Sequence, residues 1–505
     1  MSRPSPAAPL PTALTAAATL IIMVACAGAG PAPPAPTAAG QGGATVISAG
    51  AASRVITPSL ADASRVVYVG GLERGLKATG VHDDLFARAL VFSDGKGSSI
   101  GLVVLDLIGF FNDDVELVRE ELMRRHPEVP LDYVAVASTH THAGPDVIGL
   151  WTPIGQTVDA DYIAHVRGEA VEALAEAWKR RRPARLIVAQ STAPGMAKDT
   201  RLPDLVDDTV LALGVRSLEG DEGIATLVNW NSHPSVSGGE NSTLSADFPH
   251  SLVLRMEKGW GGVALFASGD LGGQIGSGRV KIPDPATGKT PDDRMRKAEL
   301  IGDKIAGIAL AALAQTRTGD EAAASPASPA LRVRSRTFYV PMENPRFAQG
   351  LGIGLIRARR LYPPDGTGNG RLPSEVPELV GSRGGAYTLR SEAAVLDIGP
   401  ARLALIPGEL YPELALGGIQ DPQDPGADFQ GAPKEPPLRA MSDRPLFLIC
   451  LANDELGYLI PKSEWDSEAP YAYGRDEPQY GEKNSVGPEA APIVMRALQD
   501  LLSQK

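Results

Sequence analysis

The chain has 505 residues, of which 43% are hydrophobic and 21% charged, and its formal net charge is −12. These values are typical of a soluble globular protein, and the length suffices for one large domain or for two or three ordinary ones. The acidic balance excludes nucleic acid as an expected partner, because binding phosphates needs a surplus of lysine and arginine on one face. The one basic run, at 179–183, follows a helical pattern and is better explained as the end of a helix.

The first 25 residues form a candidate export signal. One arginine precedes an apolar stretch, and Cys26 follows Val24 and Ala25. This order is typical of a bacterial lipoprotein signal peptide, whose cysteine becomes the lipidated N-terminus; an ordinary cleaved signal and a short anchor helix are the alternatives. We expect an exported cell-envelope lipoprotein, on the periplasmic or outer-membrane face and held at the membrane by its lipid, or else a secreted protein.

The composition changes after Cys26. Residues 26–48 are rich in proline, alanine and glycine, which predicts a flexible tether, and residues 49–505 are expected to form the folded domain. Cys26 and Cys450 are the only cysteines, so a lipidated Cys26 leaves the domain without an internal disulfide. Cys450 lies in an apolar run and is expected to be buried.

Short apolar runs alternate with helical patterns along the domain, which predicts an α/β fold with a mixed sheet flanked by helices. Their continuous apolar character indicates strands that are buried on both faces. The expected strands cover 100–111, 131–139, 184–190, 226–232, 262–269, 403–409 and 445–454. The expected helices cover 113–127, 161–183, 296–316 and a short C-terminal segment, and the expected loops cover 319–330 and 362–375.

Several of the buried runs end in polar, glycine-containing stretches. Ligands of α/β proteins bind outside the carboxyl ends of strands, so we expect a metal site at these ends. "STHTHAGP" carries His140 and His142, which would face one site along an extended backbone, and "NWNSHP" carries His233 after another strand. Two or three imidazoles with a carboxylate are typical of zinc or a similar divalent ion; hydrogen-bonded structural histidines are the alternative. The spacing does not choose between His140 and His142 as the ligand.

The other four histidines follow no such strand end and are expected to be structural or surface residues; they are His82, His126, His165 and His250.

These motifs resemble those of the neutral (non-lysosomal) ceramidases. "STHTHAGP" is similar to that family's Thr-His-Thr-His-Ser-Gly-Pro motif, and "LANDELGYLIPKSEW" to its Ala-Asn-x-Tyr-x-x-Tyr-x-x-Thr-x-x-Glu-Tyr motif. The resemblance runs in the same order from about residue 65 to 490 and includes "TGVHDDLFARALVF", "NWNSHP", "LSADFPHSLVLRME" and "LIPGELYPELA". The family's additional C-terminal immunoglobulin-like domain is expected to be absent, because the chain ends soon after the tyrosine motif.

The resemblance implies a zinc site and a set of ligands. Carried over by motif, the Zn²⁺ ligands are His140, His233, Glu409 and Tyr458. His142 would then face the substrate as a hydrogen-bond donor or proton carrier. From the residues alone, a surface carboxylate is the alternative for Glu409, although the Pro-Gly turn before it favours a ligand. Tyr458 is, without the resemblance, better explained as a packed aromatic.

One motif departs from the family pattern. The family's Gly-Asp-x-Ser-Pro-Asn aligns with "GDLGGQ" at 269–274, so Gly272 stands at the serine and Gln274 at the asparagine. Glycine cannot act as a nucleophile, which leaves water activated by the metal. We expect Gly272 and Gln274 to contact substrate. Asp270 is expected to assist catalysis by orienting a histidine, with a turn residue as the alternative.

The sequence therefore predicts a zinc-dependent hydrolase of linear amide C–N bonds that resembles neutral ceramidase. Its substrate would be an N-acyl lipid, as in sphingolipid metabolism, or another small amide. Two alternatives remain: a metal hydrolase of non-lipid amides or esters, and a non-catalytic surface-binding lipoprotein that keeps the fold.

Overall fold

The computed structural model describes residues 46–504 apart from 63–64, 317–330, 377–378 and 380–384. The predicted signal peptide, Cys26, most of the tether and the loop 319–330 lie outside the described residues. One compact unit spans Thr45–Lys505. Among the described helices, none has the length and apolar character needed to cross a membrane.

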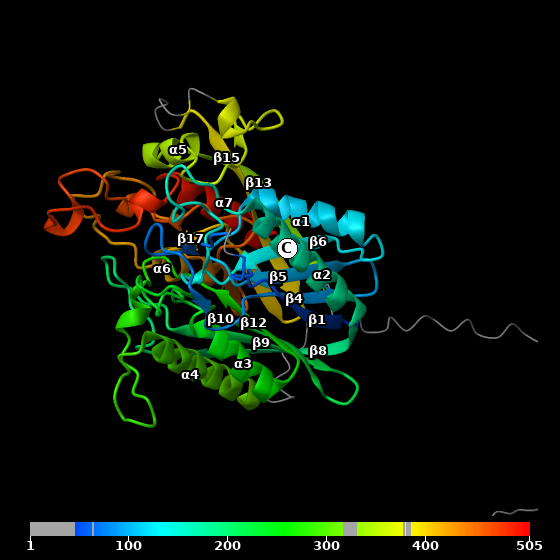
Figure 1. Cartoon of the computed structure of the whole chain (residues 1–505). Coiled ribbons are helices and arrows are strands. Elements are labelled where there is room, and N and C mark those ends of the chain that lie inside the picture. The colour runs from blue at the N-terminus through cyan, green and yellow to red at the C-terminus, as the bar shows by residue number, and fades with distance from the viewer. Residues whose placement is uncertain (1–45, 63–64, 317–330, 377–378, 380–384, 505) are drawn as a thin grey trace, which may run out of the picture. The chain divides into compact units, whose positions relative to one another are not determined.

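Two sheets form the centre of the fold (Figure 1). The larger has eight strands in the order β12-β10-β9-β8-β1-β4-β5-β6, and parallel and antiparallel neighbours are mixed in both sheets. The strands of the larger sheet are β1 (Ser48–Val55), β4 (Phe86–Ser93), β5 (Ser99–Leu105), β6 (Tyr133–Ser138), β8 (Arg182–Thr192), β9 (Thr209–Ser217), β10 (Gly223–Trp230) and β12 (Val263–Ser268). The smaller sheet contains β13 (Leu331–Pro341), β14 (Leu361–Tyr362), β15 (Thr388–Ile398), β16 (Ala401–Leu405) and β18 (Leu446–Ile449).

Three short ribbons of two strands each stand outside these sheets. They are β2 (Val69–Gly70) with β7 (Gly144–Pro145), β3 (Gly80–Val81) with β11 (Thr243–Leu244), and β17 (Glu409–Leu410) with β19 (Tyr458–Leu459).

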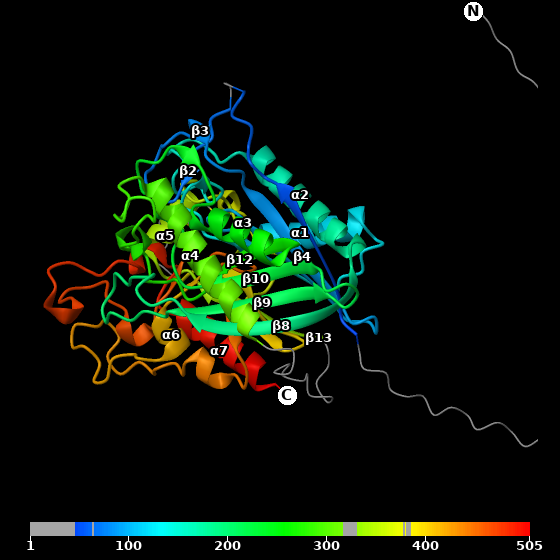
Figure 2. The same ribbon diagram turned by 90° about the horizontal axis from the view of Figure 1, so that it is seen from below.

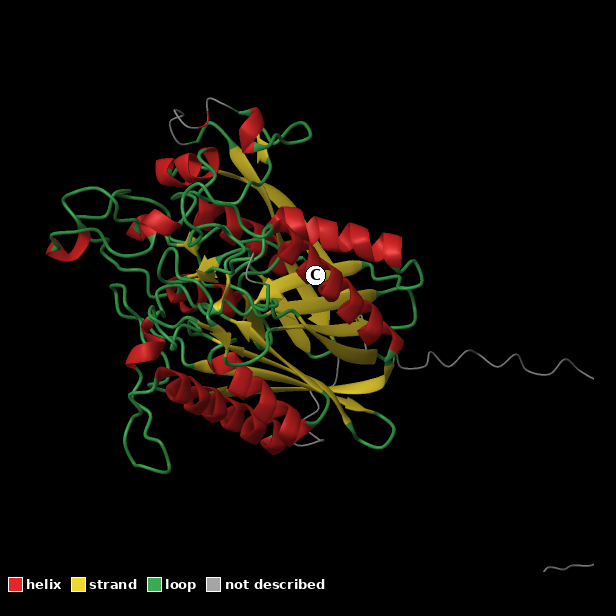
Figure 3. Ribbon diagram, in the orientation of Figure 1, coloured by secondary structure: helices red, strands yellow, loops and turns green. Residues whose placement is uncertain are grey.

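Helices cover the outer faces of both sheets (Figures 2 and 3). α1 (Asn112–Arg125) and α2 (Ala160–Lys179) cover the β1–β4–β5–β6 half of the larger sheet, and α3 (Phe248–Trp260) and α4 (Arg294–Gln315) cover the other half. α7 (Ala490–Ser503) lies on β13 and β15 of the smaller sheet. The remaining helices are short: α5 (Pro345–Gly352), α6 (Pro412–Leu416), and single 3₁₀ turns at Gly276–Arg279, Pro373–Glu375, Leu438–Met441, Lys462–Glu464, Ala472–Gly474 and Glu482–Asn484.

The two sheets pack face to face, and the alternation of side chains along each strand shows it. In β4, Ala89 and Val91 pack toward the helices, whereas Leu90 and Phe92 pack into the core between the sheets. Successive residues of a strand point to opposite faces, so a strand covered on both faces needs an uninterrupted apolar run. This confirms the predicted α/β class with a mixed, helix-flanked sheet.

Some element boundaries differ from the prediction. The strand expected at 100–111 ends at Leu105, because the buried Asp106 carboxylate accepts hydrogen bonds from Phe86 N at 2.9 Å and from Arg88 Nη1 at 2.7 Å, and the chain turns there. The apolar residues that follow it pack as core before α1. The helix expected at 161–183 ends at Lys179, and its predicted last residues already belong to β8.

α3 was not predicted from the sequence. Its N-cap, Asp247, accepts a hydrogen bond from Phe248 N at 2.8 Å, and Pro249 follows in the first turn. Both are ordinary helix-start signals.

The side chain of Glu413 in α6 is fully buried, and neither of its carboxyl oxygens has a hydrogen-bond partner. Burial and the neighbouring Glu464 raise the pKa of Glu413 to about 8. The unfolded chain loses this proton near the ordinary pKa of about 4.3. Stability from this group is therefore full at low pH and is lost as pH rises through about 8.

The Glu413→Gln variant should lose less stability between pH 5 and 8 than the native chain, as measured by thermal unfolding. Glu468→Gln, at an exposed position, is the matched control. Parallel pH profiles for the native chain and Glu413→Gln would contradict this assignment.

Candidate metal centre

The ends of strands from both sheets meet at one place. Hydrogen bonds join Ser138 N to Leu451 O at 3.1 Å and Cys450 N to Ser268 O at 2.9 Å, linking the last residues of β6 and β12 to the segment that follows β18. Ala137 also forms an isolated antiparallel bridge with Ala452. Cys450 is buried, as predicted. Side chains that leave the carboxyl ends of these strands are therefore held against one another by backbone hydrogen bonds.

His140 occupies a left-handed backbone conformation with φ of 67°. Its N–H donates to Leu107 O at 2.9 Å, and its ring Nδ1 donates to Ile108 O at 2.6 Å. A carbonyl oxygen only accepts, so the Nε2 lone pair of this ring is left free to bind a metal. The prediction of an extended backbone through His140 and His142 is wrong. The two rings nevertheless converge, with centroids 4.8 Å apart.

The loops that carry the three histidines are bonded together. His142 N donates to Pro234 O at 2.9 Å, and His233 N donates to Gln274 O at 3.2 Å. One ligand atom from each of His140, His142 and His233 lies within 4.8 Å of the others. These three histidines could therefore hold a metal ion.

Glu409 and Tyr458 reach the same point from the ribbon β17–β19. The two residues are direct partners in this parallel pair, so their side chains leave the ribbon on the same face. Glu409 Oε2 lies 2.8 Å from His233 Nε2 and 3.3 Å from His140 Nε2. Tyr458 OH lies 3.4 Å from His233 Nε2. The structure thus brings together all four residues that the resemblance gave as zinc ligands, and places His142 beside them.

Burial and charge shift the pKa values of this group. Burial, together with His140 and His233, lowers the pKa of His142 well below its usual value. Burial raises the pKa of Glu409, but the facing His140 and His233 outweigh it and hold that pKa well below the usual range. Burial and the Glu409 charge raise the pKa of Tyr458 well above its ordinary value. These shifts favour neutral imidazole on His142 and carboxylate on Glu409 at neutral pH, which are the forms that bind metal ions.

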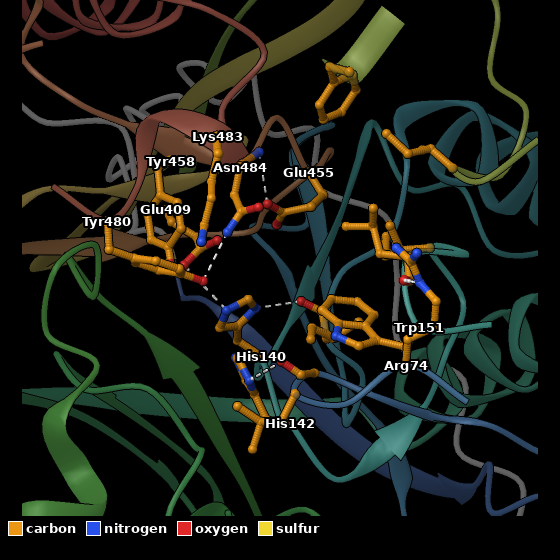
Figure 4. A pocket seen from close by; sticks show the side chains of 18 of the residues that line it. Arg74, His140, His142, Trp151, Glu409, Glu455, Tyr458, Tyr480, Lys483 and Asn484 are labelled. Atoms are coloured by element: carbon orange, nitrogen blue, oxygen red, sulfur yellow. Dashed lines mark hydrogen bonds and ion pairs between the residues drawn. The ribbon is translucent and has the colours of Figure 1, made fainter. Parts of the chain in front are cut away.

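A cavity of 370 Å³ opens beside these side chains (Figure 4). One part of its lining is polar and contains His140, His142, Glu409, Tyr458, Glu455, Tyr480, Lys483 and Asn484. The apolar part is formed by Leu72, Ile108, Phe111, Ile148, Leu150, Trp151, Phe347 and Ile356.

Asp146 organises the apolar lining. Its carboxylate accepts hydrogen bonds from the backbone N–H of Ile148 at 3.0 Å and of Trp151 at 3.0 Å, and from Thr152 at 2.7 Å. This buried carboxylate fixes the loop that presents Ile148, Leu150 and Trp151 to the cavity.

The structure places Asp270, Gly272 and Gln274 away from the expected contacts. Asp270 is buried, and its carboxylate accepts from Arg439 Nη2 at 3.3 Å rather than from one of the three histidines. Gly272 and Gln274 do not line the cavity. Gly272 N donates to Leu410 O at 2.8 Å, and Gln274 accepts from His233 N through its backbone, so both support the strand and loop that carry Glu409 and His233.

Several residues that line the cavity were not singled out in the sequence. Glu455 lies within "LANDELGYLI" at a strand end, which is a usable signal, and Trp151 follows "STHTHAGP" closely. Tyr480, Lys483 and Asn484 come from an irregular polar segment with no periodic pattern that could have pointed to them.

Comparison with solved structures identifies the fold. The crystal structure of neutral ceramidase from Pseudomonas aeruginosa matches with a TM-score of 0.63 at 18% sequence identity, over 91% of this chain and 74% of that one. This is the fold of a neutral ceramidase. A ceramidase complexed with C2 matches with a TM-score of 0.62 at 17% identity, over 91% of this chain and 75% of that one. No protein-family model and no curated protein matches the sequence.

The backbone around Gly272 leaves no room for a side chain. A Cβ atom added there would lie 2.7 Å from Glu409 O and 2.8 Å from Leu410 O, and backbone atoms cannot move aside cheaply. The Gly272→Ser variant, which restores the family's serine, should displace β17, with an overpacking cost of about 1–3 kcal/mol.

Gly272→Ser should therefore show a lower thermal unfolding temperature and weaker metal binding than the native chain. Gly278→Ser is the control, because a Cβ atom there would meet nothing closer than 4.0 Å. Equal unfolding temperatures of Gly272→Ser and Gly278→Ser would contradict the predicted displacement of β17.

Proposed function

We propose that the chain is a member of the neutral ceramidase family and a zinc-dependent hydrolase of linear amide bonds, with an N-acyl lipid as substrate. One observation carries the proposal: the side chains of His140, His233, Glu409 and Tyr458, which lie far apart in the sequence, meet beside one cavity. The fold that brings them together is the fold of those enzymes.

The donor atoms fit a zinc ion. Ligand atoms of a tetrahedral zinc ion with bonds of about 2.0–2.1 Å lie about 3.3 Å apart. The observed separations are 3.3 Å from His140 Nε2 to Glu409 Oε2, 2.8 Å from His233 Nε2 to the same oxygen, and 3.4 Å from Tyr458 OH to His233 Nε2. The chemistry also fits, because imidazole and carboxylate are ordinary zinc ligands.

Zinc bound by such a set supplies a Lewis acid that polarises a carbonyl group and makes water nucleophilic near neutral pH. We assign the proton transfer to His142. Its Nδ1–H donates to Gly71 O at 3.1 Å, which leaves an unprotonated Nε2, and that atom is buried without a hydrogen-bond partner. His142 Nε2 therefore accepts the proton of the attacking water and can return it to the amine that leaves.

The lining of the cavity supports an acyl group as one part of the substrate. Eight of its residues are apolar, and they stand beside the polar group that contains His140 and Glu409. An acyl chain against the apolar part would leave its amide carbonyl at the candidate ligands. This arrangement favours N-acyl lipids over peptide or cell-wall amides, which would bring polar groups into contact with Phe111, Trp151 and Phe347.

No serine stands among the described residues that line this cavity. Gly272 carries no side chain, Ser268 Oγ donates to Thr139 O at 2.8 Å, and Ser277 Oγ lies 3.3 Å from Ser235 Oγ. Neither serine lines the cavity. The nucleophile is therefore assigned to water.

The ligand assignment predicts different effects for two histidines. His233→Ala should abolish stoichiometric zinc, whereas His142→Ala should keep about one zinc per chain and lose on the order of 10²–10⁴-fold in kcat through the missing proton acceptor. Elemental analysis of the purified full chain measures the metal. Loss of zinc in His142→Ala, with zinc retained in Tyr458→Phe, would instead favour the three-histidine set.

The activity is tested with a fluorescent ceramide and the full chain. Chelator should lower cleavage on the order of a hundredfold or more, since the metal contributes several kcal/mol, and added zinc should restore it. One bound zinc without ceramide cleavage would discard the lipid amide in favour of other amides and esters. A chain that binds no zinc and cleaves none of these substrates would contradict the proposed function and favour a non-catalytic binding protein.

A further inference from the structure

The cavity beside the candidate ligands contains a second acidic side chain. Glu455 lines it on the same side as Tyr480 and Lys483, opposite Trp151 (Figure 4). Its Oε1 accepts a hydrogen bond from Gly457 N at 2.9 Å, which fixes the carboxyl group in place. Its Oε2 is buried and has no hydrogen-bond partner.

The backbone makes room for this side chain. A Cβ atom on Gly109 would lie 2.9 Å from Glu455 Cγ and 3.3 Å from Glu455 Oε2. A glycine at this position is what allows Glu455 to lie against the chain that follows β5. The carboxyl group is therefore held on both sides and is not a mobile surface acid.

Two other polar groups of the cavity already have partners. Tyr480 OH accepts from Asn484 Nδ2 at 2.9 Å, and Arg74 Nε donates to Leu150 O at 3.0 Å. Among the described residues that line the cavity, two buried side-chain atoms lack a partner: His142 Nε2 and Glu455 Oε2. The proposed mechanism uses His142 Nε2 to accept a proton, but it does not use Glu455 Oε2. A buried carboxyl oxygen without a partner is costly, so a ligand that satisfies it gains affinity.

We propose that Glu455 is a specificity-determining residue that accepts a hydrogen bond from a hydroxyl or amino group on the amine half of the amide substrate. This inference rests on the proposed function for the orientation of the substrate. An acyl chain occupies the apolar lining around Trp151, so the amine half is the part that meets the polar side. In the family motif that "LANDELGYLI" resembles, a tyrosine stands at this position, so the carboxyl group is a feature of this chain.

The test compares three probes of equal length and nearly equal shape: the dodecanoyl amides of ethanolamine, ethylenediamine and propylamine. They differ in one terminal group, which is a hydroxyl, an ammonium or a methyl. A hydrogen bond to a charged group makes a difference of about tenfold to a hundredfold in affinity. Binding is measured by calorimetry on the full chain treated with chelator, so that turnover does not interfere.

Burial and the Glu409 charge raise the pKa of Glu455 well above its usual value, so the native chain should bind the hydroxyl probe roughly twofold to tenfold tighter than the propyl probe. The ammonium probe should bind about tenfold or more tighter than the propyl probe, because its positive charge favours the ionised carboxylate. Glu455→Leu should remove this preference, and Glu455→Gln should keep it for the hydroxyl but lose it for the ammonium group. Glu468→Leu, at an exposed position outside the cavity, should change nothing.

Equal affinities of the three probes for the native chain, an unchanged preference in Glu455→Leu, or no binding of any probe would each overturn the role of Glu455. Cleavage of the propyl amide by the chain reloaded with zinc is measured separately. Failure of that cleavage counts against the proposed function, while the binding comparison still decides the role of Glu455.

Discussion

The carboxylate of Glu409 lies between two buried imidazole rings, and the rest of the site depends on this contact. Its Oε2 approaches His233 Nε2 and His140 Nε2 at 2.8 and 3.3 Å, and all three side chains are buried. Taking such groups out of water is costly unless their partners are well placed. The fold provides the placement with backbone hydrogen bonds: His140 is fixed by Leu107 and Ile108, and Glu409 by its pairing with Tyr458.

The sandwich of two sheets explains why these side chains can meet. The carboxyl ends of β6, β10 and β12 in one sheet, and of β16 and β18 in the other, lead into the same region. A site built on strand ends is rigid at its base, while the loops beyond it are free to form a cavity. Apolar residues from the loop fixed by Asp146 and polar residues from the segment around Tyr480 thus face one cavity from distant parts of the chain.

Much of this could be predicted from the sequence. Uninterrupted apolar runs indicate strands covered on both faces, and the polar residues after them indicated a metal site that includes His140, His233 and Glu409. Tyr458 was expected as a ligand only from the resemblance. The roles of Gly272 and Gln274 could not be predicted in this way, because a motif gives the order of residues but not the face that each presents. The left-handed conformation of His140 and the early end of β5 at Asp106 were equally hidden, since both depend on hydrogen bonds to distant backbone.

The central claim is that four protein atoms hold one zinc ion, and the most direct measurement is anomalous X-ray diffraction at the zinc absorption edge from crystals of the full chain. The account predicts a single strong peak within about 2.0–2.2 Å of His140 Nε2, His233 Nε2 and Glu409 Oε2, with Tyr458 OH as the fourth protein atom. A peak bound instead by the rings of all three histidines, or no peak in zinc-containing crystals, would contradict it.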